Sequence, residues 1–94
     1  MKEPFEQIAA VLDQVASIAE RVPDDVVRSS ARELQRTFAE RGSVEPAVGR
    51  LQNSVSRLSR DERPRAVEQK IVNQLDSAIA EQLIPELRRV GFDV

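Results

Sequence analysis

Apolar residues recur along this chain at intervals of three and four, the spacing that lines one face of an α-helix. The cleanest run lies in the middle of the chain, at Val44, Val48, Leu51, Val55 and Leu58. No segment alternates apolar and polar residues over the length of a strand, as a half-buried strand would. The hydrophobic pattern therefore predicts an all-α chain.

Proline, glycine and short polar segments interrupt this pattern at Pro23, Gly42 and Pro64. Proline is tolerated in the first turn of a helix, and glycine commonly follows a helix end. The breaks therefore predict four helices, at about 4–22, 24–41, 44–59 and 62–90. Because the connections are short, neighbouring helices should be antiparallel and form one compact bundle domain over residues 1–94.

Two glycines stand where a helix is expected to end, and a third lies inside one. Gly42 is expected to take the left-handed position after the second helix. Gly91 is expected to close the last helix, with Phe92 at the hydrophobic contact of a Schellman motif. Gly49 lies inside the third helix, where it costs roughly 1 kcal/mol relative to Ala. A close helix approach or a local bend would offset that cost.

Pro85 lies inside the last predicted helix. Its ring removes the N–H bond to the Glu81 carbonyl, and it disfavours helical geometry at the preceding residue, Ile84. We therefore expect the fourth helix to be kinked or restarted at Pro85.

The first and last helices carry more apolar residues than one buried stripe accommodates. Val11 and Ile18 lie about 100° around the first helix from its main stripe, which begins at Phe5. The last helix has a similar surplus at Val72 and Ile84. A chain of this size buries only about 60–65% of its unfolded surface, so spare apolar positions favour self-association as a homodimer. The predicted partner or self-association face is Val11, Ile18, Val72 and Ile84.

The composition argues against most catalytic and metal chemistry. The chain contains no Cys, His, Trp or Tyr. Without Cys and His it lacks thiolate ligands, the commonest metal ligand and the usual general base near neutral pH. We therefore expect no enzymatic activity, no catalytic residue, no metal site and no cofactor.

Charge is nearly balanced over the whole chain, with 14 Lys and Arg against 16 Asp and Glu. The densest basic segment surrounds the break before the fourth helix and includes Arg57, Arg60, Arg63 and Arg65. Such a cluster could contact phosphates or an acidic partner. Alternatively, Arg57 and Arg60 only complement the dipole at a helix C-terminus. No aromatic residue is interleaved for base stacking, which argues against nucleic acid.

No signal-peptide-like run and no stretch of 18 apolar residues occurs in the sequence; a membrane-spanning helix needs such a stretch. We expect a cytoplasmic protein with no membrane partner. Twelve Arg against two Lys is typical of a GC-rich bacterial gene.

These features together favour a small non-enzymatic protein-interaction module: an adaptor, a regulator or inhibitor, or an assembly subunit. Its partner would be another protein or a second copy of itself. The apolar face would supply contact area, and the Arg57–Arg65 cluster would orient the partner. The alternative is a nucleic-acid-associated protein that grips phosphates through that cluster.

Overall fold

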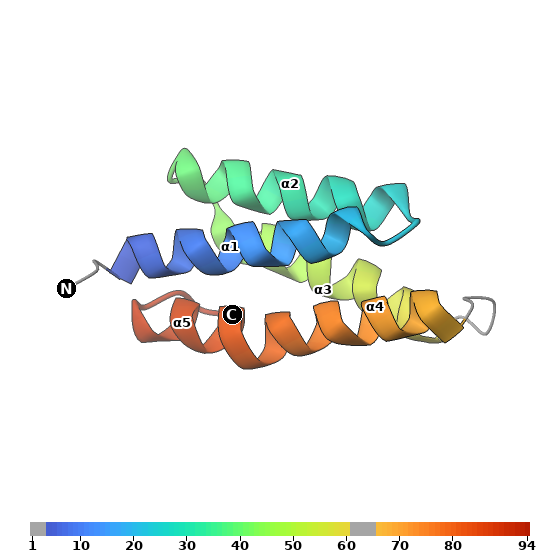
Figure 1. Cartoon of the computed structure of the whole chain (residues 1–94). Helices are drawn as coiled ribbons and strands as arrows, with labels where there is room; N and C mark the ends of the chain where they lie inside the picture. The colour runs from blue at the N-terminus through green and yellow to red at the C-terminus, as the bar shows by residue number, and fades with distance from the viewer. Residues whose placement is uncertain (1–3, 61–65) are drawn as a thin grey trace.

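The computed structural model describes residues 4–60 and 66–94 (Figure 1), and within these ranges every regular element is helical. This confirms the predicted all-α bundle of four helices, close to the predicted bounds. The fourth helix is built from three consecutive segments, one of which is a π-helical turn. The elements are α1 (Pro4–Glu20), α2 (Asp25–Ala39), α3 (Val44–Arg60), α4 (Ala66–Ala78), η1 (Ile79–Leu83) and α5 (Ile84–Arg89).

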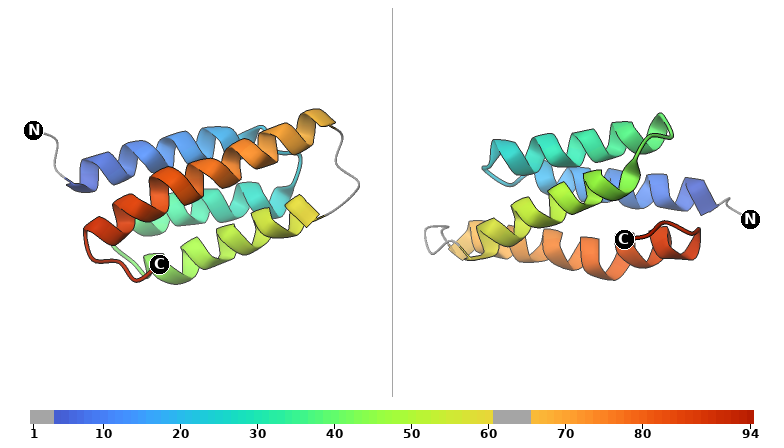
Figure 2. Two further views of the ribbon diagram at one scale, coloured as in Figure 1. Left: turned by 90° about the horizontal axis from the view of Figure 1, so that it is seen from below. Right: turned by 180° about the vertical axis from the view of Figure 1, so that it is seen from behind.

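Each helix of the bundle packs against two others. α1 contacts α2 on one side and α4, η1 and α5 on the other, while α3 contacts α2 and α4. Figure 2 shows that the start of α1 and the end of α5 lie at the same end of the bundle. The antiparallel course brings the end of α2 and the start of α3 to that end as well (Figures 1 and 2).

The placement of α1 between two neighbours explains its broad apolar surface. Ile18 is 7% exposed, and Val72 and Ile84 are 2% and 6% exposed; all three belong to the core of the single chain. Val11 is half-buried and packs against that core. The expectation that these four positions are surplus to a single-chain core is therefore wrong. With a neighbour on each side, α1 buries two stripes within the single chain.

Asp24 caps the second helix, which begins at the next residue. Its backbone is extended, and its Oδ1 accepts a hydrogen bond of 3.0 Å from the Val27 N–H. A carboxylate here satisfies one of the N–H groups that a helix start leaves without a partner, and it complements the helix dipole. The predicted break at Pro64 lies outside the described residues.

α2 and α5 both end in Schellman motifs. After α5, Gly91 has a φ of 103°, and the Phe92 N–H donates to the Leu87 carbonyl, which confirms the prediction. After α2 the prediction is wrong by one residue. The left-handed position belongs to Arg41, with a φ of 56°, and Gly42 is the next residue, whose N–H donates to the Thr37 carbonyl. The helix therefore ends one residue earlier than predicted, with Glu40 as its last capping residue.

The fourth helix passes Pro85 without stopping. The backbone is helical on both sides of η1, and the Ile84 N–H donates to the Ile79 carbonyl, five residues back. In an uninterrupted α-helix, Ile84 would lie about 140° around the axis from Ile79. A π-turn takes up one extra residue and reduces this to about 40°. The π-turn thereby returns Ile84 to the buried face, and Pro85 follows in the first turn of α5.

Candidate functional site

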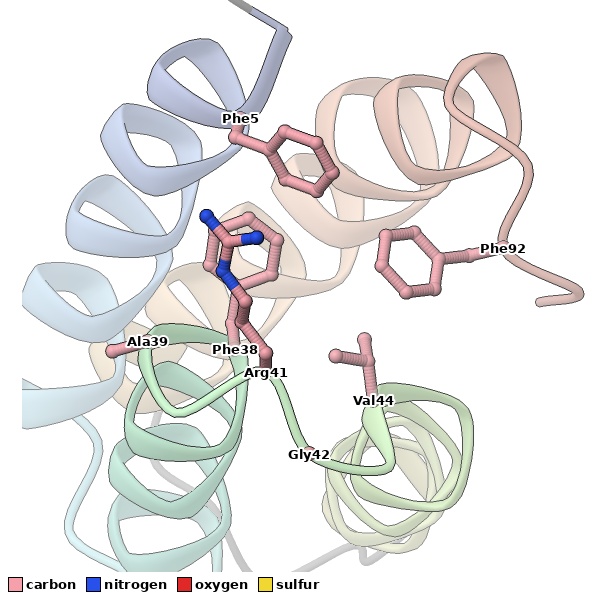
Figure 3. Close-up of a pocket in the computed structure, with 7 residues that line it drawn as sticks. All are labelled: Phe5, Phe38, Ala39, Arg41, Gly42, Val44 and Phe92. Atoms are coloured by element: carbon pink, nitrogen blue, oxygen red, sulfur yellow. The ribbon is translucent and has the colours of Figure 1, made fainter.

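An apolar hollow of about 350 Å³ lies at the end of the bundle where four helix termini meet (Figure 3). Its lining comes from the first turn of α1, the end of α2, the α2–α3 turn, the start of α3 and the segment after α5. The lining residues are Phe5, Phe38, Ala39, Arg41, Gly42, Val44 and Phe92. We call this feature the aromatic hollow.

All three aromatic residues of the chain line the aromatic hollow. The ring centres of Phe5 and Phe38 are 6.0 Å apart, and those of Phe38 and Phe92 are 6.5 Å apart. These separations are within the range of favourable tilted ring pairs. Figure 3 shows the three rings and Val44 arranged around a common space. The packing holds the rings in place and leaves this space between them.

Phe5 is the most accessible of the three rings, with 49% of its surface exposed. The sequence pattern placed it on the buried stripe of the first helix, and that prediction is wrong for this residue. Phe5 is the second residue of α1, and at this end of the bundle the described residues cover its ring only in part. Phe38 and Phe92 are half-buried and pack against the core.

A backbone motif and a side-chain hydrogen bond hold Phe92 in the wall of the hollow. The Schellman motif at Gly91 turns the chain back toward the bundle, and the Arg88 Nε donates a 2.8 Å hydrogen bond to the Val94 carbonyl beyond it. The final residues are thereby tied to α5, and Val94 itself packs against the core. The wall is therefore part of the folded structure.

Among the described residues that line the hollow, Arg41 supplies the only charge. Its guanidinium carbon lies 5.8 Å from the centre of the Phe5 ring, within cation–π distance. Left-handed backbone costs a non-glycine residue about 1–2 kcal/mol, and such residues are enriched at functional sites. In Figure 3 the Arg41 side chain extends from the α2–α3 turn toward Phe5.

None of the four positions of the predicted contact face lines the aromatic hollow. The sequence nevertheless held a signal for this site. All three phenylalanines lie close to a predicted helix end, and an antiparallel bundle brings the start of the first helix to the ends of the second and fourth. The residue that sequence reasoning missed altogether is Arg41, because its role depends on the register of the turn.

The predicted basic cluster is only partly within the described residues. Arg57 is exposed and its Nη2 lies 3.8 Å from the Asp24 Oδ2, which ties α3 to the cap of α2. Arg60 is exposed at the end of α3. Arg63 and Arg65 lie outside the described residues. For Arg57, the ion pair supports the structural interpretation over a free phosphate contact.

A second, shallower hollow of about 310 Å³ lies between α2 and α3, beside the exposed Val26. Arg50 and Arg57 line it together with Asn53. Arg50 donates a 2.6 Å hydrogen bond to Glu33, so both arginines already face a carboxylate. The local charge is therefore largely neutralised, which weakens this groove as an anion site.

In the described ranges no three acidic side chains gather closely enough to hold a metal ion. No helix of the described chain has the length and apolar character needed to cross a membrane. Comparison of the chain with protein-family models, curated proteins and solved structures finds no match.

Proposed function

We propose that this protein is a non-enzymatic interaction module that binds a partner protein by one large apolar side chain held in the aromatic hollow. One observation carries the proposal: all three aromatic residues of the chain line a single open hollow at one end of the bundle. Phenylalanine side chains are usually buried in the core of a protein, yet here the Phe5 side chain is half-exposed. Binding hot spots are typically aromatic-lined pockets of this kind.

The size of the hollow fits an anchor from a protein segment. A volume of about 350 Å³ is at the lower end of the range for ligand sites, which is about 300–1,000 Å³. A partner segment would place one side chain inside and rest its backbone on the surrounding helix ends. Buried anchors of this type supply most of the affinity of small interfaces.

The rest of the described surface offers less to a partner. The largest exposed apolar side chains are Phe5 and Val26, both 49% exposed, and they belong to different helices. The four predicted contact residues lie in the core of the single chain or pack against it. The argument for self-association that rested on them therefore no longer holds. We therefore favour a different protein as the partner over a second copy.

Selection from a random peptide library tests the proposal, with the folded chain immobilised as bait. We expect wild-type protein to enrich peptides that share a large apolar residue. Phe5→Ser should abolish this enrichment, because it removes one wall of the hollow. Phe5 is half-exposed in a first helical turn, so the variant should remain folded, as circular dichroism would check.

Val26→Ser is the matched control, since it removes an apolar side chain with the same exposed fraction from another part of the surface. This variant should enrich the same peptides as the wild type. Enrichment that survives Phe5→Ser, or that Val26→Ser abolishes, would contradict the proposal. So would the absence of any common apolar residue among the selected peptides.

A further inference from the structure

A positive charge, that of Arg41, lies at the edge of the aromatic hollow. This charge indicates which chemical group should accompany the apolar side chain of a partner. Arg41 is exposed and stands over Phe5. Arg41 is one of several arginines of the described chain that form no ion pair, whereas Arg28, Arg32, Arg50, Arg57 and Arg89 each form one. No carboxylate of the described chain lies within ion-pair distance of Arg41, whose recorded side-chain partner is the Phe5 ring.

A guanidinium beside an aromatic ring keeps hydrogen-bonding capacity for an anion. Arginine has five N–H donors in a planar fork, and a ring below the plane engages none of them in a conventional hydrogen bond. The fork matches the two oxygens of a carboxylate. The contact with Phe5 also restricts the side chain before any partner binds, which lowers the entropic cost of binding.

We propose that the aromatic hollow recognises a partner segment in which a carboxylate side chain, Asp or Glu, accompanies the large apolar residue. The apolar group would lie among Phe5, Phe38 and Phe92, and the carboxylate would accept hydrogen bonds from Arg41. This inference rests on the proposed function and specifies its ligand. It also gives a role to Arg41, which has a left-handed backbone conformation although the next residue in the turn is a glycine.

The surroundings favour one carboxylate over a polyanion. Glu40 precedes Arg41 in the chain, Glu45 is in the first turn of α3, and both are exposed. A strand of phosphates crossing this end would meet these acidic groups, whereas a single carboxylate needs only the Arg41 fork. An ammonium group in the same place would meet the Arg41 charge directly. The ligand that fits is therefore an apolar group that carries a single carboxylate.

Three small probes of the same shape test this inference: phenylbutyrate, phenylbutyramide and phenylbutylammonium. Each would be titrated into the full chain and followed by NMR. For the wild type we expect phenylbutyrate to bind about five- to tenfold more tightly than the amide, which corresponds to about 1–1.4 kcal/mol. The ammonium probe should bind most weakly.

Arg41→Gln should bring the affinity for phenylbutyrate down to that for the amide, so that this variant no longer discriminates between the two probes. Arg36→Gln is the matched control, because it removes the same charge from an exposed position on α2 that does not line the hollow. This control should keep the preference for the carboxylate. Equal affinities for acid and amide in the wild type, or a preference that survives Arg41→Gln, would overturn the inference.

The same titrations separate a failure of the inference from a failure of the proposed function. If Phe5→Ser weakens both acid and amide but the wild type does not discriminate between them, the hollow binds apolar groups and only the role of Arg41 is wrong. If no probe binds, or if binding is insensitive to Phe5→Ser, the proposed function itself is contradicted, and the inference fails with it.

Discussion

Single residues decide where the helices of this bundle begin and end. Asp24 begins α2 by accepting the Val27 N–H, and Gly91 ends α5 in a conformation that suits glycine. Arg41 performs the same task at the end of α2 with a side chain that glycine lacks. The turn would form more easily with glycine, so the arginine is best explained by what its guanidinium does at the hollow.

Replacing Arg41 separates its backbone cost from its side-chain contact. Arg41→Gly should unfold with a free energy within about 1 kcal/mol of the wild type, because relief of the left-handed strain offsets the lost cation–π contact. Arg41→Ala should be about 1 kcal/mol less stable than Arg41→Gly, since both variants lose the contact and only alanine keeps the left-handed strain. Chemical denaturation measures both values. An alanine variant as stable as the glycine variant would show that the turn is not strained.

The other two helix-related glycines should respond in opposite directions to alanine. A Cβ at Gly49 would meet no atom within 4 Å, so no close helix approach requires glycine there. Gly49→Ala should therefore raise the free energy of unfolding by roughly 1 kcal/mol. Gly91→Ala, also in open space but at a φ of 103°, should lower it by about 1–2 kcal/mol. Thermal denaturation of the pair checks the sign, and a stabilised Gly91→Ala variant would contradict the Schellman assignment.

At the scale of elements, the helices were predictable because their signals are local. The apolar stripe of α3 and the breaks at Pro23 and Gly42 lie within a few residues of the structure they determine. The burial of Ile18 and Ile84 was not predictable in this way. It depends on α1 having two neighbours and on the phase shift introduced by η1.

The π-turn before Pro85 leads to a prediction about the fourth helix. Pro85→Ala should leave the helical circular dichroism signal unchanged, because the backbone is already helical on both sides. Stability should change by less than about 1 kcal/mol, rather than by the roughly 3 kcal/mol associated with an interior proline. The turn should persist because it keeps Ile84 buried. A clear gain in helical signal together with a large gain in stability would show that Pro85 bends the helix.

At the scale of the whole molecule, one chain buries its own apolar stripes. The core includes the surplus residues of the first and last helices, and the described surface leaves Phe5 and Val26 as its large exposed apolar side chains. The hollow was not predictable at this scale, because helix ends from the beginning, the middle and the end of the chain create it together. Sequence reasoning placed Phe5 on an apolar stripe and Phe92 at a helix end without showing that the two lie beside Phe38.

This closed core predicts a monomer in solution. Light scattering coupled to gel filtration, from micromolar to hundreds of micromolar protein, should give the mass of one chain throughout. The reason is that no contiguous apolar face of the size of a typical dimer interface is exposed on the described surface. A dimer that forms with rising concentration and persists in Phe5→Ser would restore self-association through another face.

The most direct test of the central claim is amide NMR mapping of the isotope-labelled chain with a peptide enriched by the library selection. The aromatic hollow should give chemical-shift changes at the start of α1, the end of α2, the α2–α3 turn and Phe92. Changes concentrated instead on the α2–α3 groove around Arg50, Asn53 and Arg57 would contradict the claim and move the interaction site to the basic side of the molecule.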